Sequence, residues 1–177
     1  MKEKSASESL TVMTEMVLPN DTNTLNNLMG GRLLHWMDIA AAIAAQRHCN
    51  RTVVTASVDS VSFQRAITLG DVVIIKAQVT RTFNSSMEVR LEVTAENVPS
   101  GIKIRSNEAF YTFVAVDQVG QPIPVAEVIP ETEEEKRFYD SAMQRRQLRL
   151  IFSGKMKPDD AKELKALFEK ATEGTLN

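Results

Sequence analysis

The sequence predicts an α+β fold, in which an antiparallel sheet wraps around one long buried helix and a helical tail follows. Several β-branched, partly alternating runs are joined by short turns without intervening helices, which is typical of an antiparallel sheet. A long run rich in Leu, Met and Ala precedes most of these strand-like runs. The end of the chain carries the mixed charges of amphipathic helices.

The 177 residues are expected to form one domain with an appendage. We predict a flexible N-terminus over residues 1–9, a domain over residues 10–130 and a helical extension over residues 131–177. The formal net charge of −2 gives no reason to expect nucleic-acid binding.

Cys49 is the only cysteine, so no internal disulfide can form and a reducing compartment fits best. The N-terminus lacks the apolar core of a signal peptide, and no apolar run is long enough to span a membrane. We therefore expect a cytoplasmic protein that does not bind membranes.

The first predicted strand runs from Leu10 to Leu18, where polarity alternates imperfectly, and Pro19 ends it. The loop "PNDTNTLNN" that follows is rich in residues that form turns. Residues 30–48 contain no proline and are predicted to form a helix. Because this helix is apolar around most of its circumference, it should be largely buried.

Four further runs predict the rest of the sheet. The cleanest alternation places Met87, Val89, Leu91 and Val93 on one face of a strand. The turn "NSS" before this strand is short enough for a hairpin. The four runs cover residues 52–63, 71–83, 86–97 and 106–117.

The tail predicts two helices. Residues 130–150 begin with acidic side chains and end with basic ones, an order that suits the helix dipole. Residues 159–172 place Leu164, Leu167 and Phe168 on one apolar face. We expect this face to lie on the body of the protein or on a neighbouring subunit.

The chain shows none of the common motifs for metal or nucleotide chemistry. His35 and His48 lie thirteen positions apart without clustered ligands, which argues against a metal site. Phosphate-binding loops and the G-x-S-x-G nucleophile motif are missing from the sequence. Cys49 is interpreted as a structural thiol.

The stretch "DTNTLNNLMGGRLLHWMD" is the best candidate for chemistry. The first N–H groups of a helix lack internal partners, so Gly30 and Gly31 could lie against a carbonyl oxygen that becomes negative. Asp38, two turns further along an apolar helix, could act as a general base or nucleophile. Spacing alone also allows Asp38 to pair structurally with Arg32 or His35, and packing alone could explain the two glycines.

Several motifs occur together in one order: "PNDTN", "GG", "MD", "VVTASVDSVSF", "SSMEVRLEV" and "YTFVAVD". In this order they closely resemble the bacterial acyl-CoA thioesterases of the hotdog fold, in the branch that includes brain-type acyl-CoA hydrolase. The resemblance covers about residues 10–130. It implies hydrolysis of acyl-CoA to free fatty acid and CoA, without a metal or other cofactor.

The resemblance also implies roles for individual residues. Asp38 would be the general base or nucleophile, Asn23 would assist from the facing subunit, and the backbone N–H of Gly30 or Gly31 would polarise the thioester carbonyl. Other residues would contact the substrate. Thr55, Asp59 and Phe63 would line the groove, and Ser85 and Ser86 would receive the nucleotide part of CoA.

In quaternary structure, the resemblance implies a homodimer with shared active sites, often assembled into a hexamer as a trimer of dimers.

Leu25, Asn26 and Asn27 depart from the pattern of some relatives, and His35 matches no motif of the family. Two other functions stay open at this point. One is a different acyl-thioester reaction, such as hydroxyacyl-CoA dehydration, and the other is a non-catalytic acyl-CoA sensor.

Overall fold

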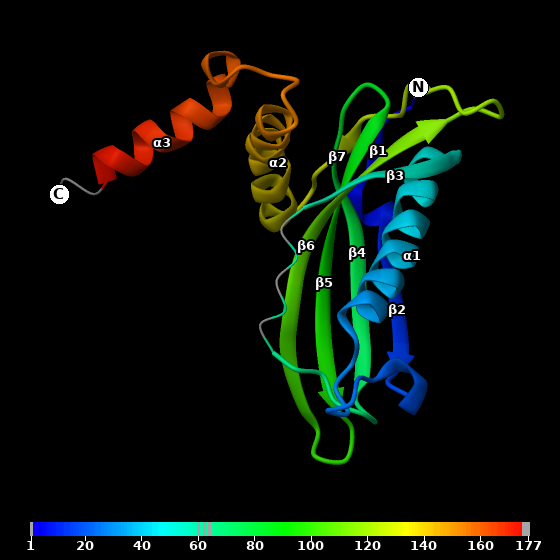
Figure 1. Ribbon diagram of the computed structural model, residues 1–177. Coiled ribbons are helices and arrows are strands. Elements are labelled where there is room, and N and C mark those ends of the chain that lie inside the picture. Colours follow the sequence, from blue (N-terminus) through cyan, green and yellow to red (C-terminus); the bar gives the residue numbers. More distant parts are fainter. Residues whose placement is uncertain (1, 60, 62, 64, 175–177) are drawn as a thin grey trace. The chain divides into compact units, whose positions relative to one another are not determined.

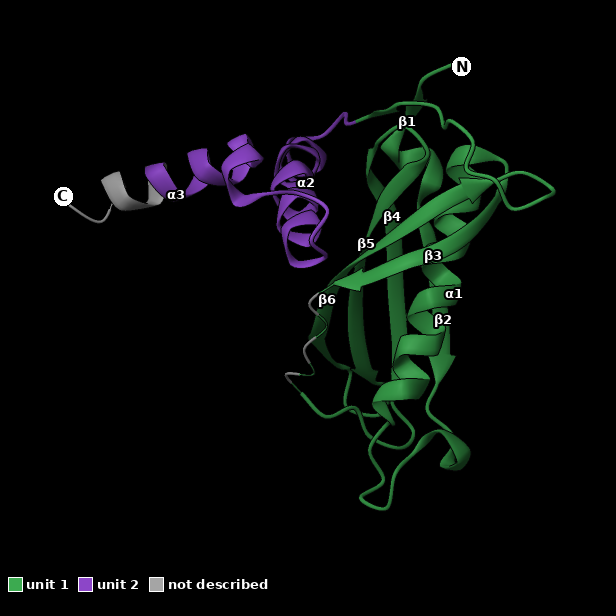
Figure 2. Ribbon diagram, turned by 45° about the horizontal axis from the view of Figure 1, so that its top comes forward, with its two compact units in different colours: residues 1–129 green, residues 130–177 purple. Residues whose placement is uncertain are grey.

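The computed structural model describes residues 2–59, 61, 63 and 65–174, and Figure 1 shows the order of their helices and strands. The chain divides into two compact units, coloured separately in Figure 2. Unit 1 covers Met1–Ile129 and unit 2 covers Pro130–Asn177. Each unit is described by itself below.

Unit 1 is built on an antiparallel sheet of five strands within the described part of the chain, in the order β2-β4-β5-β6-β3. The predicted strands are all present. The strand β3 follows the helix in sequence but pairs with β6, so it forms one edge of the sheet, and β2 forms the other. The strands are β2 (Thr11–Met16), β3 (Thr52–Asp59), β4 (Val72–Thr82), β5 (Ser86–Asn97) and β6 (Ile102–Val116).

The helix α1 (Gly30–Cys49) lies along one face of this sheet (Figure 2). Its buried residues recur every three or four positions, and four of them are alanines, which let the helix approach the strands closely. Ile39 and Ile43 are each 38% exposed, so the helix is buried along one side only and not around most of its circumference as expected. The buried side comprises Leu33, Trp36, Met37, Ala40, Ala41, Ala44, Ala45 and His48.

The sheet residues beneath α1 alternate as the strand period requires. Met87, Val89, Leu91 and Val93 are fully buried, as their alternation in the sequence predicts. They continue across the sheet into the buried residues of the neighbouring strands. These are Val73, Ile75, Ala77 and Val79 of β4, and Ala109, Tyr111, Phe113 and Ala115 of β6.

The N-terminal residues are folded, whereas the sequence analysis expected a flexible segment. The short strand β1 (Lys4–Ser5) pairs in parallel with β7 (Val128–Ile129), and residues 6–9 form a turn of 3-10 helix. Ser9 is buried, and its hydroxyl accepts a 2.9 Å hydrogen bond from the Val79 amide. The polar composition of this segment suggested a loose tail. The partners that hold it lie far away in the sequence, so no local pattern indicated them.

Unit 2 contains α2 (Glu133–Phe152) and α3 (Lys162–Gly174), near the two predicted segments. Thr132 begins α2 with a capping box, in which its hydroxyl accepts from the Glu135 amide and the Glu135 carboxylate accepts from the Thr132 amide. The Leu164 amide of α3 donates to the Gln147 side chain of α2. None of the helices in the described part of the chain has the length and apolar character needed to cross a membrane.

Candidate active site

The half-buried carboxylate of Asp38 projects from α1 toward the edge strand β3. The Thr55 hydroxyl of β3 donates a 2.8 Å hydrogen bond to Asp38 Oδ1. The sequence analysis placed Thr55 in the groove as a substrate contact. In the structure Thr55 is a direct partner of Asp38, and this bond fixes one carboxylate oxygen while Oδ2 stays available for other partners.

The two structural partners that spacing suggested for Asp38 are used differently. Arg32 pairs with Asp21 at 2.8 Å, and the buried Asp21 carboxylate also accepts from the Leu18 amide. His35 is exposed, and no hydrogen bond or ion pair joins it to Asp38 in the described part of the structure. The His35–Asp38 dyad that spacing allowed therefore does not form.

A β-bulge in β3 decides which side chains accompany Thr55. The pairing with β6 shifts between Thr55 and Ser57, so that Thr55 pairs with Phe113 and Val58 with Tyr111. Paired residues on antiparallel strands point to the same face of a sheet. The bulge therefore places Thr55 and Val58 on the face that carries α1, although they are three positions apart.

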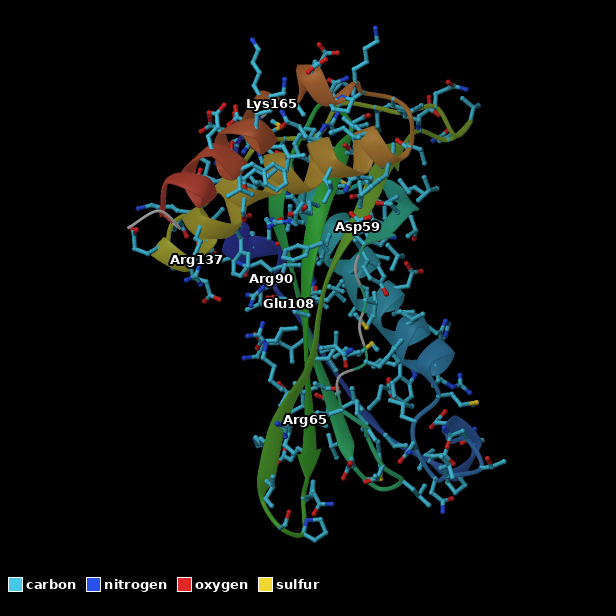
Figure 3. The ribbon with its side chains drawn as sticks, turned by 60° about the vertical axis from the view of Figure 1, so that its left-hand side comes forward. Asp59, Arg65, Arg90, Glu108, Arg137 and Lys165 are labelled. Atoms are coloured by element: carbon cyan, nitrogen blue, oxygen red, sulfur yellow. The ribbon has the colours of Figure 1, made fainter. Side chains whose placement is uncertain are left out.

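Two of the predicted binding residues lie on the opposite face of the sheet. Asp59, labelled in Figure 3, ends β3 and pairs with Phe110. Ser86 pairs with Val114, whose neighbours on β6 face α1. Within one chain, the side chains of Asp59 and Ser86 therefore point away from Asp38.

Ser85 lies in the turn before β5, where its carbonyl accepts a hydrogen bond from the Ala115 amide. A role for Ser85, Ser86 or Asp59 in CoA binding stays a prediction. On the same outer face, β5 and β6 are linked by a close ion pair, in which Arg90 Nε lies 2.6 Å from Glu108 Oε1 (Figure 3).

The helix start has open amide donors. Gly30 and Gly31 are the first two residues of α1, no side chain caps the helix, and the described residues provide no partner for either amide. Such donors can stabilise a developing oxyanion. A Cβ atom added at Gly30 would lie 3.1 Å from the Phe63 ring, whereas one added at Gly31 would meet nothing within 4 Å.

An apolar pocket of about 300 Å³ adjoins this helix start. Phe63, predicted to line the groove, is one of its walls and is 52% exposed. Most of the remaining lining is apolar, so the pocket is suited to a hydrocarbon chain. The other lining residues are Leu28, Gly30, Leu33, Arg65, Ala66, Ile67 and Asn107.

Asp38 and the helix start lie too far apart in one chain to act on the same carbonyl group. Asp38 follows Gly30 by eight positions along α1, which corresponds to roughly 12 Å at the usual helical rise. A reacting carbonyl must be about 3 Å from both the oxyanion donors and the attacking group. Within one chain, the helix start and Asp38 therefore do not meet at one point.

Asn23 lies in the exposed loop before α1. Its Oδ1 accepts hydrogen bonds from the amides of Leu25 and Asn27, at 2.9 and 3.2 Å. The carbonyl side of Asn23 therefore shapes its own loop, and the amide group is the side that can donate to a ligand. The buried Asp21 and its pairing with Arg32 tie this loop to α1.

Tyr111 is a polar residue near Asp38 that the sequence analysis missed. It is only 1% exposed, and its hydroxyl has no hydrogen-bond partner among the residues that the structure describes. Burial raises the pKa of Tyr111 to about 12, and the negative charge of Asp38 contributes to this increase. In the sequence, a tyrosine inside an alternating strand is interpreted as a core residue. No local signal distinguishes a core tyrosine from one that lies near a functional carboxylate.

Residues 25–102 of the chain match the Thioesterase superfamily. The chain is also 46% identical over 138 residues to a protein of Bacillus subtilis (strain 168) called "Uncharacterized acyl-CoA thioester hydrolase YkhA". The matched segment covers 78% of this chain and 80% of that protein. The chain belongs to the thioesterase superfamily.

A longer relative of this thioesterase is the cytosolic acyl coenzyme A thioester hydrolase of Rattus norvegicus, which is 38% identical over 138 residues. That match covers 77% of the thioesterase described here but only 36% of the rat protein. Among solved structures, an apo-hexameric acyl-CoA thioesterase superposes with a TM-score of 0.84 at 42% identity, covering 86% of this chain and 98% of that one. The predicted hotdog fold of the thioesterase is thereby confirmed.

The thioesterase is also similar to an acyl-CoA hydrolase from Staphylococcus aureus that was solved with butyryl coenzyme A, coenzyme A and coenzyme A disulfide. The identity is 40% and the TM-score 0.80, over 86% of this chain and 95% of that one. The Staphylococcus enzyme has also been solved as three variants. An aspartate, a threonine or an asparagine is replaced by alanine in each of them.

Proposed function

We propose that this protein hydrolyses acyl-CoA to a free fatty acid and CoA, with Asp38 as the catalytic base or nucleophile. The observation that carries the proposal is the 2.8 Å hydrogen bond from Thr55 to Asp38, which holds a half-buried carboxylate at the edge of the sheet. The names of the relatives, which are acyl-CoA thioester hydrolases, support the same reaction.

The residues altered in the Staphylococcus variants support the choice of Asn23, Asp38 and Thr55. In that enzyme, the asparagine precedes the aspartate by fifteen positions and the threonine follows the aspartate by seventeen. Asn23, Asp38 and Thr55 have the same identities at the same spacings here. Three residue types at two matching intervals are a far more specific signal than a lone aspartate on a helix.

In the proposed reaction, Asp38 takes a proton from a water molecule whose oxygen bonds to the thioester carbon. Alternatively, the carboxylate attacks that carbon itself and forms a mixed anhydride, which water then hydrolyses to the fatty acid and the free carboxylate. The carbonyl oxygen becomes negative and is stabilised by the amides at a helix start, at Gly30 or Gly31. The carbon–sulfur bond then breaks and sulfur keeps the electron pair. Because a thiolate is a good leaving group, no histidine, cysteine, metal or other cofactor is needed.

The two halves of this machinery would come from two subunits. Asp38 lies a rise of roughly 12 Å from Gly30 in its own chain. This distance argues that the helix start and Asn23 of one chain act on the same substrate as the Asp38 of a partner chain. The edge strand β3, which carries Thr55, is the natural place for pairing with a second copy. We infer a homodimer with two shared sites, assembled further as in the hexameric relatives.

The test is thiol release from a panel of acyl-CoA substrates by wild type, Asp38→Asn and Asn23→Ala. Loss of the base should lower kcat by roughly 10²- to 10⁴-fold, without a change in thermal unfolding. Wild-type turnover by Asp38→Asn would contradict the mechanism. Tight CoA binding without turnover of any acyl chain would instead favour a sensor.

Mixing the two inactive variants tests whether the site is shared. A mixed dimer has one site with both substitutions and one site with neither, so random exchange should restore about a quarter of wild-type activity. If Asn23 and Asp38 of one chain act together, no mixture recovers activity.

We also propose a cytoplasmic location, which is supported by the cytosolic relatives.

A further inference from the structure

Tyr111 places an unused hydrogen-bond donor on the sheet face from which Thr55 reaches the candidate base. A buried hydroxyl without a partner is unfavourable by about 1–3 kcal/mol, so such groups are uncommon unless they serve a purpose. Tyr111 is fully enclosed, and its hydroxyl is one of the few buried polar side-chain groups of the described residues without a partner. The sheet interior would accept a phenylalanine here without that disadvantage.

The strand pairing brings Tyr111 to the same face as Thr55. Thr55 pairs with Phe113, and Tyr111 lies two residues before Phe113 on β6, so the two side chains face α1 together. Asp38 reaches this face from α1 through its 2.8 Å hydrogen bond with Thr55. Thr55, Tyr111 and Asp38 therefore lie on the same side of the sheet, on the edge strand, the adjacent strand and the helix.

We propose that Tyr111 is a positioning residue that acts through Asp38, donating its hydroxyl proton to the carboxylate when acyl-CoA occupies the site. This inference rests on the proposed function. Thr55 holds one carboxylate oxygen in the free protein, and Tyr111 holds the carboxylate from the sheet side once the ligand excludes water. Catalytic hydrogen bonds are often long or open in free enzymes and shorten in the substrate complex.

The chemistry of Tyr111 suits a donor and not a base. With a pKa of about 12, its hydroxyl keeps its proton throughout the physiological range. A hydroxyl that keeps its proton can donate to a carboxylate, so Tyr111 would hold the Asp38 carboxylate in its orientation. Because Tyr111 is only 1% exposed, we expect its effect to fall on kcat and not on KM.

The experiment compares Tyr111→Phe with wild type in steady-state thiol release over a range of pH. We expect kcat to fall roughly tenfold, since hydrogen bonds to charged groups are among the stronger ones, with KM little changed. The apparent pKa on the acidic side of the kcat profile should rise because the bond that favours the carboxylate is lost. Thermal stability should stay the same or increase because the variant removes an unsatisfied buried group.

Thr112→Val is the matched control. Thr112 is the next residue on β6, and its hydroxyl is also buried without a partner, but it pairs with Ser57 on the face away from α1. We expect Thr112→Val to retain the kcat and pH profile of wild type. In the Asp38→Asn background, adding Tyr111→Phe should change kcat no further, because the two residues act as one unit.

Two outcomes would overturn the assignment. If wild type releases thiol and Tyr111→Phe has the same kcat and pH profile, the positioning role fails while the proposed function stands. If Tyr111→Phe lowers kcat equally with and without Asp38, Tyr111 does not act through that carboxylate. A wild type that releases no thiol from any acyl-CoA would overturn the proposed function, and the role of Tyr111 with it.

Discussion

Asp38 is compatible with a helix that packs against a sheet because it lies at the border of the buried face. A carboxylate placed fully inside the core would be strongly disfavoured unless it were paired and hydrogen-bonded. At the border, Thr55 supplies one hydrogen bond and solvent or substrate can supply the rest. At the scale of single residues, the site is a half-buried acid with a neutral hydroxyl partner.

Gly30 and Gly31 are identical residues in different surroundings, and this contrast gives a direct test. In Gly30→Ala, the new Cβ would lie 3.1 Å from the Phe63 ring and would displace the ring or the helix start. We expect kcat/KM to fall roughly tenfold, because small displacements of catalytic groups have large effects. The measurement is thiol release with a medium-chain acyl-CoA.

Gly31→Ala is the control, since its Cβ meets nothing within 4 Å. It should lose less activity than Gly30→Ala and gain roughly 0.5 kcal/mol in the free energy of unfolding, because alanine loses less backbone entropy than glycine. Equal losses of activity in both variants would show that the Phe63 contact is irrelevant and that the helix start tolerates no side chain.

At the scale of elements, β3 both carries the partner of Asp38 and forms an edge that a second chain could pair with. Its bulge turns Thr55 toward α1, and its outer edge has no strand partner in the described chain. Exposed edge strands invite pairing with another chain unless charges or prolines protect them. Val54 and Val58, on opposite faces of β3, are 48% and 47% exposed and offer no such protection.

Val54→Lys should therefore weaken the assembly. Val54 pairs with Val114 on the face away from α1, so the substitution does not touch Asp38 directly. We expect a lower mass in solution by light scattering and a parallel loss of activity, because the shared site needs a partner. Val12→Lys on the other edge strand, β2, is the control at a 55% exposed position and should keep the oligomer. Dissociation by Val12→Lys alone would assign the dimer contact to β2.

At the scale of the whole of unit 1, the C-terminal end of α1 joins three distant segments. The Lys4 ammonium donates to the Arg47 carbonyl, and the Arg47 guanidinium donates to the Leu10 carbonyl. His48 is fully buried, and its Nε2 lies 2.9 Å from the Ala126 carbonyl oxygen. Because a carbonyl only accepts, Nε2 must carry the proton, and the described part of the chain provides no partner for Nδ1.

This buried imidazole should make stability depend on pH. Burial lowers the pKa of His48 below 6.5, and the nearby Lys4 lowers it further, while the bond to Ala126 and the charge of Glu8 act in the opposite direction. The unfolded chain therefore binds the proton more readily than the folded chain. Stability contributed by neutral His48 is complete above about pH 6.5 and is lost as the pH falls below that value.

The measurement is the free energy of unfolding between pH 7 and pH 5 for wild type and His48→Gln. The wild type should lose stability faster than the variant, by at most about 1.4 kcal/mol per pH unit for one group. Whatever its stability at pH 7, His48→Gln should have a flatter profile. Parallel profiles would mean that His48 contributes nothing to the pH dependence.

Much of the fold was predictable because it depends on local patterns. The period of Met87, Val89, Leu91 and Val93 indicated a half-buried strand, and all four are buried. Strand order was not predictable from these patterns, because it requires pairing between distant segments. For the same reason, the folded N-terminus was missed: Ser9 finds its partner at Val79, seventy residues away.

The sequence by itself determined that an acid on an apolar helix, two glycines and an ordered set of motifs point to thioester chemistry. Only the tertiary structure decided which groups meet. It paired Asp38 with Thr55 rather than with Arg32 or His35, turned Asp59 and Ser86 to the opposite face, and brought Tyr111 beneath the site. The physical reason is that identity and period are local properties, whereas facing, burial and proximity arise only when distant strands pair around the helix.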